Sequence, residues 1–120
     1  QRCRERIAIM TGPSHFIFPA MALGAKGFIA TGPELLGKAA GAIAARATEV
    51  MGPEHRTLHY RLTVLYQTLM GTGTWPSALK AALNLIGQPA GVPRDPVMPL
   101  AGTDLDNLRR TLDEFVLLPA

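Results

Sequence analysis

The three histidines are the side chains of this chain most able to do chemistry near neutral pH. His55 and His59 are four residues apart, so on a helix they share one face and could bind a metal ion together. Beyond Glu54, no carboxylate or third ligand is arranged beside the pair. We therefore expect an exposed helix face at these positions and no metal site.

His15 stands three residues after Gly12, where a short apolar run gives way to a helical pattern. Such a histidine either contacts a substrate or bonds to water or backbone at a helix start, and the pattern leaves both open. Tyr60 and Tyr66 are six residues apart in a helical pattern. We expect both tyrosines to pack there with their hydroxyls outward.

The composition predicts a globular protein without a disulfide. The chain has 120 residues, of which 48% are hydrophobic and 18% charged, enough for one domain with a modest core. Its single cysteine, Cys3, excludes an internal disulfide and a cysteine-based zinc site. Because a lone cysteine fits a reducing compartment, we expect a cytoplasmic protein.

The charge pattern argues against two classes of partner. The net charge of +3 is small and no run of Lys or Arg is interleaved with aromatic residues, so we expect no nucleic-acid partner. The longest uncharged stretch, residues 7–25, contains glycine, two prolines, serine and histidine, which makes it a poor membrane span. The first residues are charged and no long apolar run follows them, so we expect no signal peptide and no membrane partner.

Side chains that do chemistry need elements to position them, and the first part of the chain predicts a strand, a helix and a second strand. Apolar runs predict strands at residues 7–10 and 27–30, the first ended by a Gly-Pro pair. Between them, Ser14 is a fair N-cap for a helix that has Pro19 in its first turn and ends at Gly24.

Four helices are predicted downstream. We expect them from Pro33 to about residue 51, from Glu54 to about residue 70, from Pro76 to about residue 86, and from Thr103 onwards. The second carries a leucine stripe at helical spacing, formed by Leu58, Leu62, Leu65 and Leu69. Two strands joined by a helix form a βαβ unit whose strands are parallel. Two strands do not make a stable sheet, so the pattern predicts the end of a larger parallel sheet or barrel.

Several segments together are similar to one enzyme family. The run MTGPSHFIFPAMALGAKGFIA, residues 10–30, resembles the last two strands of the dihydrodipicolinate synthase and N-acetylneuraminate lyase family, with Gly12, Leu23-Gly24-Ala25-Lys26-Gly27 and Ile29 at matching separations. WPSALKAALNLIG resembles the family's Pro-x-x-x-Lys helix, and GVPRDPVMPL resembles its closing segment. The resemblance covers residues 7–118, and the order and spacing of the motifs make it specific.

The resemblance implies an α/β fold: the last two βα units of a (β/α)8 TIM barrel in residues 1–52, followed by a C-terminal helical domain in residues 53–120. Enzymes of this family join a lysine to the keto carbon of pyruvate or another 2-oxo acid as a Schiff base, and a tyrosine moves protons. The implied function is a Schiff-base lyase, aldolase or dehydratase without a separate cofactor. The implied partners are the 2-oxo acid, the remainder of the barrel and further copies in a homotetramer.

The lysines of this chain do not fit the role of the Schiff-base nucleophile. That lysine must be desolvated and must lie at or near the carboxyl end of a barrel strand. Lys26 precedes the second predicted strand, while Lys38 and Lys80 fall inside predicted helices. We therefore expect no catalytic residue here, a catalytic lysine upstream of this chain, and a segment that is inactive alone.

Three residues are the candidate substrate-binding residues. The family position that matches Ile29 lies beside the keto-acid pocket, and Gly12 allows backbone to approach a ligand closely. His15 joins them because barrel active sites lie at the carboxyl ends of strands. Ala30 stands where the family often has serine, and Pro13-Ser14-His15 replaces its Asp-rich turn. Which 2-oxo acid binds, and whether it is cleaved, condensed or dehydrated, stays open.

Two other classes of protein stay open. One is a non-enzymatic helical interaction module whose strands only dock it on a partner. The weaker one is a small basic nucleic-acid binder. A strand that ends in lysine some tens of residues upstream of Gln1 would favour the enzyme.

Overall fold

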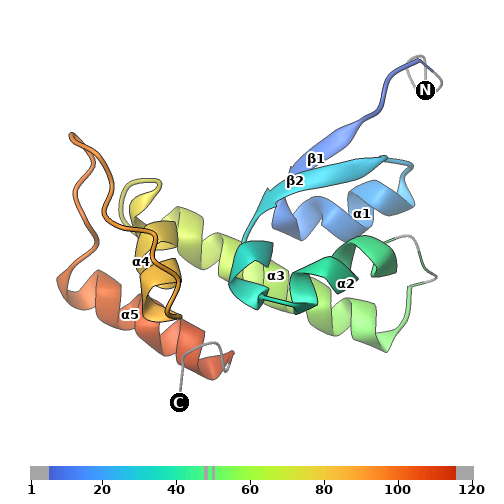
Figure 1. Cartoon of the computed structure of the whole chain (residues 1–120). Helices are drawn as coiled ribbons and strands as arrows, with labels where there is room; N and C mark the ends of the chain where they lie inside the picture. Colours follow the sequence, from blue (N-terminus) through green and yellow to red (C-terminus); the bar gives the residue numbers. More distant parts are fainter. Residues whose placement is uncertain (1–5, 48, 50, 116–120) are drawn as a thin grey trace. The chain divides into compact units, whose positions relative to one another are not determined.

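The computed structural model describes residues 6–47, 49 and 51–115, so Cys3 lies outside the described residues. The chain divides into two compact units, Gln1–Tyr66 and Gln67–Ala120. The division falls inside helix α3 (Pro53–Gly71) (Figure 1). The predicted boundary between the end of a barrel (residues 1–52) and a helical domain (residues 53–120) is not tested by this division and stays a prediction.

The first unit contains a parallel pair of strands. β1 (Met10–Pro13) pairs with β2 (Gly27–Thr31) in parallel, with Met10 opposite Gly27. A short 3₁₀ helix, η1 (Ser14–Phe16), and helix α1 (Ile17–Ala22) join them. The predicted βαβ unit is therefore confirmed, and the second strand is one residue longer than predicted.

The predicted position of the first strand, residues 7–10, is wrong. Ile7 and Ile9 are 59% and 52% exposed, and the strand begins at Met10. A strand exists only where a neighbour pairs with it, and β2 first pairs at Met10. The Gly-Pro pair does not break β1, because Pro13 is the last residue of a strand at the edge of this two-stranded sheet.

Helix α1 begins and ends for two separate reasons. Pro19 falls in its first turn and Gly24 follows its end with φ of +99°, as predicted. The Gly24 N–H donates to the carbonyl of Met21, and the Ala25 N–H donates to the carbonyl of Ala20. Ser14 is not the N-cap: it is fully buried, and Phe16 occupies the cap position.

The helix predicted from Pro33 to residue 51 is interrupted. It consists of a 3₁₀ helix, η2 (Pro33–Leu36), and helix α2 (Ala39–Arg46). Gly37 separates them with φ of +54°, a left-handed conformation that glycine adopts readily and that cannot continue a helix. Ile43 of α2 and Ala47 at its C-cap are buried in the core.

Apolar helix faces cover one side of the two strands. Figure 1 shows α1 and α2 along the same side of the sheet. The buried cluster of this unit consists of Ile17, Phe18, Ile43, Ala47 and Leu62, with Phe28 and Ala30 of β2 packed against it. The leucine stripe of α3 is confirmed at Leu62, Leu65 and Leu69, which are buried.

We expect the strands to be the least protected elements when this chain is studied alone. Within residues 6–47, 49 and 51–115, β1 and β2 pair only with each other, and a two-stranded sheet is marginal in water. Amide exchange should therefore be fast in residues 10–13 and slow in residues 62–69, where buried leucines hold α3. Equally strong protection of both strands in a monomer would contradict this expectation.

The second unit is built on two packed helices. Helix α4 (Ser77–Leu85) packs against helix α5 (Gly102–Glu114), and a segment of residues 86–101 connects them. Pro76 stands at the N-cap of α4, close to the predicted start. Thr103 does not cap α5: Ala101 holds the N-cap in an extended conformation, so Thr103 lies inside the first turn.

In the described part of the chain, no helix has both the length and the apolar character needed to cross a membrane.

Candidate functional site

The carboxyl ends of β1 and β2 lie side by side, because the strands are parallel. Pro13 is paired with Thr31, so the turns that begin at Ser14 and Gly32 leave the sheet at the same end. Lys26 lies at the other end, where its N–H donates to the carbonyl of Ile9 at 2.8 Å. The prediction that Lys26 is far from the carboxyl ends is confirmed.

The side of the sheet that faces away from the core is open. Phe28 and Ala30 of β2 pack against the core, whereas Ile29 between them is 82% exposed. Gly12 of β1 is also exposed, and a Cβ on it would lie 4.0 Å from the backbone oxygen of Ile29. The structure therefore brings Gly12 and Ile29 together on a surface that is not covered by any residue the structure describes.

Nothing in the described residues requires glycine at position 12. An added Cβ there meets only the Ile29 oxygen, at ordinary van der Waals distance, and the backbone is not left-handed. A larger side chain at position 12 would therefore occupy the open face of the sheet and would not clash with the core.

His15 lies beyond the end of β1, in η1, and is half-buried. Its ring centroid is 4.3 Å from that of Phe16 and 4.8 Å from that of Tyr66 in α3. Its Nδ1 is buried and has no hydrogen-bond partner within the described ranges. His15 therefore stands just beyond the carboxyl end of β1, with its ring packed against α3.

The expectation of an exposed face at His55 and His59 is wrong. His55 is 5% exposed, its Nδ1 accepts the Gly52 N–H at 3.0 Å, and its Nε2 donates to the carbonyl of Arg46 at 2.9 Å. The ring at the third position of α3 thus folds back on the cap of its own helix and on the end of α2. His59 is half-buried, with its ring 6.4 Å from that of Phe18.

No group of three or more possible metal ligands occurs within residues 6–47, 49 and 51–115. His55 instead has a structural role, which periodicity alone could not reveal. The signal was present in the sequence, because Gly52-Pro53 places His55 where a side chain reaches the N-cap.

Of the other two lysines, Lys80 lies inside a helix as predicted, whereas Lys38 lies in the turn between η2 and α2 and not inside a helix as predicted. Lys38 is exposed at the N-cap of α2. Lys80 is half-buried in α4, and its Nζ donates to the carbonyl of Ala90 at 2.6 Å. Neither follows the end of a described strand.

Replacing Lys26 with alanine is expected to leave function and stability nearly unchanged. The side chain is exposed at the end of the sheet opposite to Gly12 and His15, so its loss should cost within about 0.5 kcal/mol. Thermal unfolding and steady-state kinetics of the variant measure both effects. A loss of turnover would contradict the orientation of the sheet described above.

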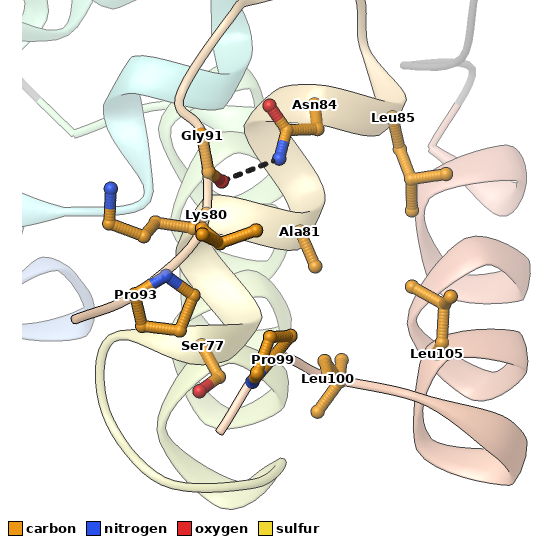
Figure 2. A pocket seen from close by; sticks show the side chains of 11 residues that line it. Ser77, Lys80, Ala81, Asn84, Leu85, Gly91, Pro93, Pro99, Leu100 and Leu105 are labelled. Atoms are coloured by element: carbon orange, nitrogen blue, oxygen red, sulfur yellow. Dashed lines mark hydrogen bonds between the residues drawn. The ribbon is translucent and has the colours of Figure 1, made fainter. Parts of the chain in front are cut away.

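The second unit contains a cavity of about 300 Å³ between α4, the connecting segment and α5 (Figure 2). Its walls are largely apolar, and they include Leu85, Leu100 and Leu105. Asn84 donates to the carbonyl of Gly91 and accepts the N–H of Ala90, both at 2.9 Å. Figure 2 shows the Lys80 amine directed away from Leu105, so the polar groups of α4 hold the connecting segment. The sequence analysis did not identify this cavity.

The chain is similar in sequence to one family of enzymes and to several of its members. The model of the dihydrodipicolinate synthetase family matches residues 1–115. A 4-hydroxy-tetrahydrodipicolinate synthase of Prochlorococcus marinus is 32% identical over 115 residues, which cover 96% of this chain and 38% of that protein. An uncharacterized DapA-like lyase of Pyrobaculum arsenaticum is 30% identical over 122 residues, which cover 95% of this chain and 40% of that protein.

Two solved structures are similar in fold as well. A dihydrodipicolinate synthase superposes with a TM-score of 0.83 at 28% identity, over 94% of this chain and 39% of that one. A putative dihydrodipicolinate synthetase from Pseudomonas aeruginosa superposes with a TM-score of 0.77 at 28% identity, over 91% of this chain and 37% of that one. The chain therefore spans about two fifths of the length of the relatives that it matches.

Proposed function

Because the chain belongs to the dihydrodipicolinate synthetase family, we propose that it forms the last two βα units and the following helices of a barrel enzyme. The enzyme acts on pyruvate or another 2-oxo acid as a Schiff-base lyase, aldolase or dehydratase. The names of the relatives, a synthase and a lyase, agree with this class of reaction.

The open side of the sheet is the observation that carries the proposal. Gly12 and Ile29 lie on a face that no described residue covers, and two strands cannot enclose it. In a (β/α)8 barrel the same face points into the barrel, toward side chains from the other strands and toward the active site at the carboxyl ends of the strands. The exposure of Ile29 is thus explained by a missing neighbour rather than by a solvent-facing role.

The nucleophile is supplied from outside this chain. A lysine that attacks the keto carbon must stand in the barrel near the strand ends, and the three lysines here lie in turns or on a helix. The attack forms a carbon–nitrogen double bond and releases the keto oxygen as water. This chain contributes the wall and the rim of the substrate site.

His15 is the polar residue of this chain that we place at the substrate. It lies in the turn just beyond the end of β1, and its buried Nδ1 has no hydrogen-bond partner among the described residues. Replacing it with alanine should lower kcat/KM about tenfold, which corresponds to about 1.4 kcal/mol of transition-state binding. Steady-state kinetics of the full-length enzyme measure this loss, and a change below twofold would remove His15 from the substrate site.

The assembly follows the family pattern in this proposal. The remainder of the barrel encloses the open sheet face and leaves the substrate space beside Gly12 and Ile29, and four copies form a homotetramer in the cytoplasm. Size-exclusion chromatography with light scattering tests the tetramer on the full-length protein.

Borohydride trapping tests the proposed function. The full-length protein is incubated with pyruvate, reduced and digested, and the modified lysine is located by mass spectrometry. We expect one reduced pyruvate adduct per subunit, on a lysine outside this chain, and no adduct when this chain is treated alone. A protein without an adduct, or an adduct on Lys26, Lys38 or Lys80, would overturn the proposal.

A further inference from the structure

The middle of α3 contacts the turn that follows β1. Ser14 is fully buried, and its hydroxyl donates to the carbonyl of Leu62 at 3.4 Å. The next residue, His15, packs its ring against Tyr66, one helical turn further along α3. The hydrogen bond is long and therefore weak, so the packing of buried Ser14 and of the His15 ring against α3 also holds the turn in place.

The same part of α3 closes on the turn that follows β2. Gly32 is buried, with φ of +114°. A Cβ at this position would lie 3.3 Å from the Ser14 hydroxyl and 4.0 Å from the Cβ of Leu65. The two turns and α3 therefore meet at one tightly packed point, which we call the rim junction: Ser14, Gly32 and residues 62–66.

We propose that the rim junction braces the substrate-binding face, with Ser14 and Gly32 as positioning residues that act through His15 and the ends of both strands. The proposal rests on the proposed function, because it takes the carboxyl ends of β1 and β2 as part of the substrate site. Neither residue touches substrate: Ser14 points into α3, and Gly32 has no side chain.

A change at the rim junction should affect the binding of pyruvate more than the reactivity of the lysine. The nucleophilic lysine lies outside this chain, whereas the rim and the wall of the site lie within it. A displaced rim removes contacts that substrate makes before and during reaction alike, so it should raise the half-saturating substrate concentration while the lysine keeps its reactivity.

The test uses pyruvate as the probe and the full-length protein. Ser14→Ala removes the hydroxyl at the rim junction. It should raise the pyruvate concentration that half-saturates borohydride trapping at least fivefold, with one adduct per subunit still reached at saturation. Ser77→Ala is the matched control, because Ser77 is also buried and donates to a backbone carbonyl, that of Met98 in the second unit. It should leave the half-saturating concentration within twofold.

A second pair of variants tests the other side of the contact. Tyr66→Ala removes the ring that packs on His15 and should weaken pyruvate binding as Ser14→Ala does. Tyr66→Phe keeps the ring and should restore most of the affinity.

The outcomes separate the brace from the enzyme. If the unmodified protein forms no adduct, the proposed function and the brace both fall. If it forms the adduct, and Ser14→Ala leaves the half-saturating concentration unchanged or Ser77→Ala raises it equally, only the brace is overturned.

Discussion

Replacing Gly12 with valine is expected to raise the pyruvate concentration that half-saturates Schiff-base trapping about 100-fold, or about 2.7 kcal/mol. The valine side chain would stand on the open sheet face beside Ile29, in the space that we assign to substrate. An added Cβ meets only the Ile29 oxygen at 4.0 Å, so the fold itself should tolerate the change.

Gly41→Val is the matched control for this variant. Gly41 is an exposed residue of α2, and a Cβ added to it meets nothing within 4 Å. It should leave pyruvate trapping within about twofold, since it adds the same group away from the strands. Trapping that is equally weak in both variants, or unchanged in Gly12→Val, would contradict the assignment of the open face to substrate.

The second large effect concerns stability. Replacing His55 with alanine should destabilise the first unit by about 3 kcal/mol, because it removes two hydrogen bonds and leaves the Gly52 N–H and the Arg46 carbonyl without their partner. The ring also contacts Phe18 edge-on, with centroids 5.6 Å apart, and its loss opens a cavity in the core.

Amide exchange of the full-length protein measures this effect locally. Protection in residues 58–65 should fall about 100-fold, which corresponds to about 2.7 kcal/mol. His59→Ala is the control, because His59 is half-buried four residues away on the same helix. It should reduce protection less than tenfold. Equal losses of protection in the two variants would show that the two hydrogen bonds of His55 do not stabilise the first unit more than an ordinary side chain of α3 does.

Local patterns in the sequence were sufficient for most elements. Apolar spacing predicted β2, α3 and the buried leucines Leu62, Leu65 and Leu69, because the pattern that marks a strand or the apolar face of a helix is set by residues only a few positions apart. Gly24 predicted the end of α1, since a left-handed residue there terminates a helix. The likeness of residues 7–118 to one family also followed from the order of motifs and is confirmed by the family match over residues 1–115.

The position of β1 and the role of Ser14 depended on contacts between distant residues. The apolar run at residues 7–10 looks like a strand, yet strand pairing is decided by β2, which is 17 positions later at the first pair, Met10 with Gly27. Ser14 looks like an N-cap, but the approach of α3 draws its hydroxyl to Leu62, 48 residues away.

The sequence by itself determined the alternation of strands and helices, the apolar helix faces and the absence of a lysine at the carboxyl end of either predicted strand. Only the tertiary structure decided that buried His55 joins the start of α3 to the end of α2 by hydrogen bonds. It also decided that Gly12 and Ile29 share one open face, and that Ser14 and Gly32 meet on α3. The physical reason is the distance along the sequence between the residues that interact. Helix faces and turns arise from residues a few positions apart, whereas burial and site geometry arise when packing brings distant segments within contact distance.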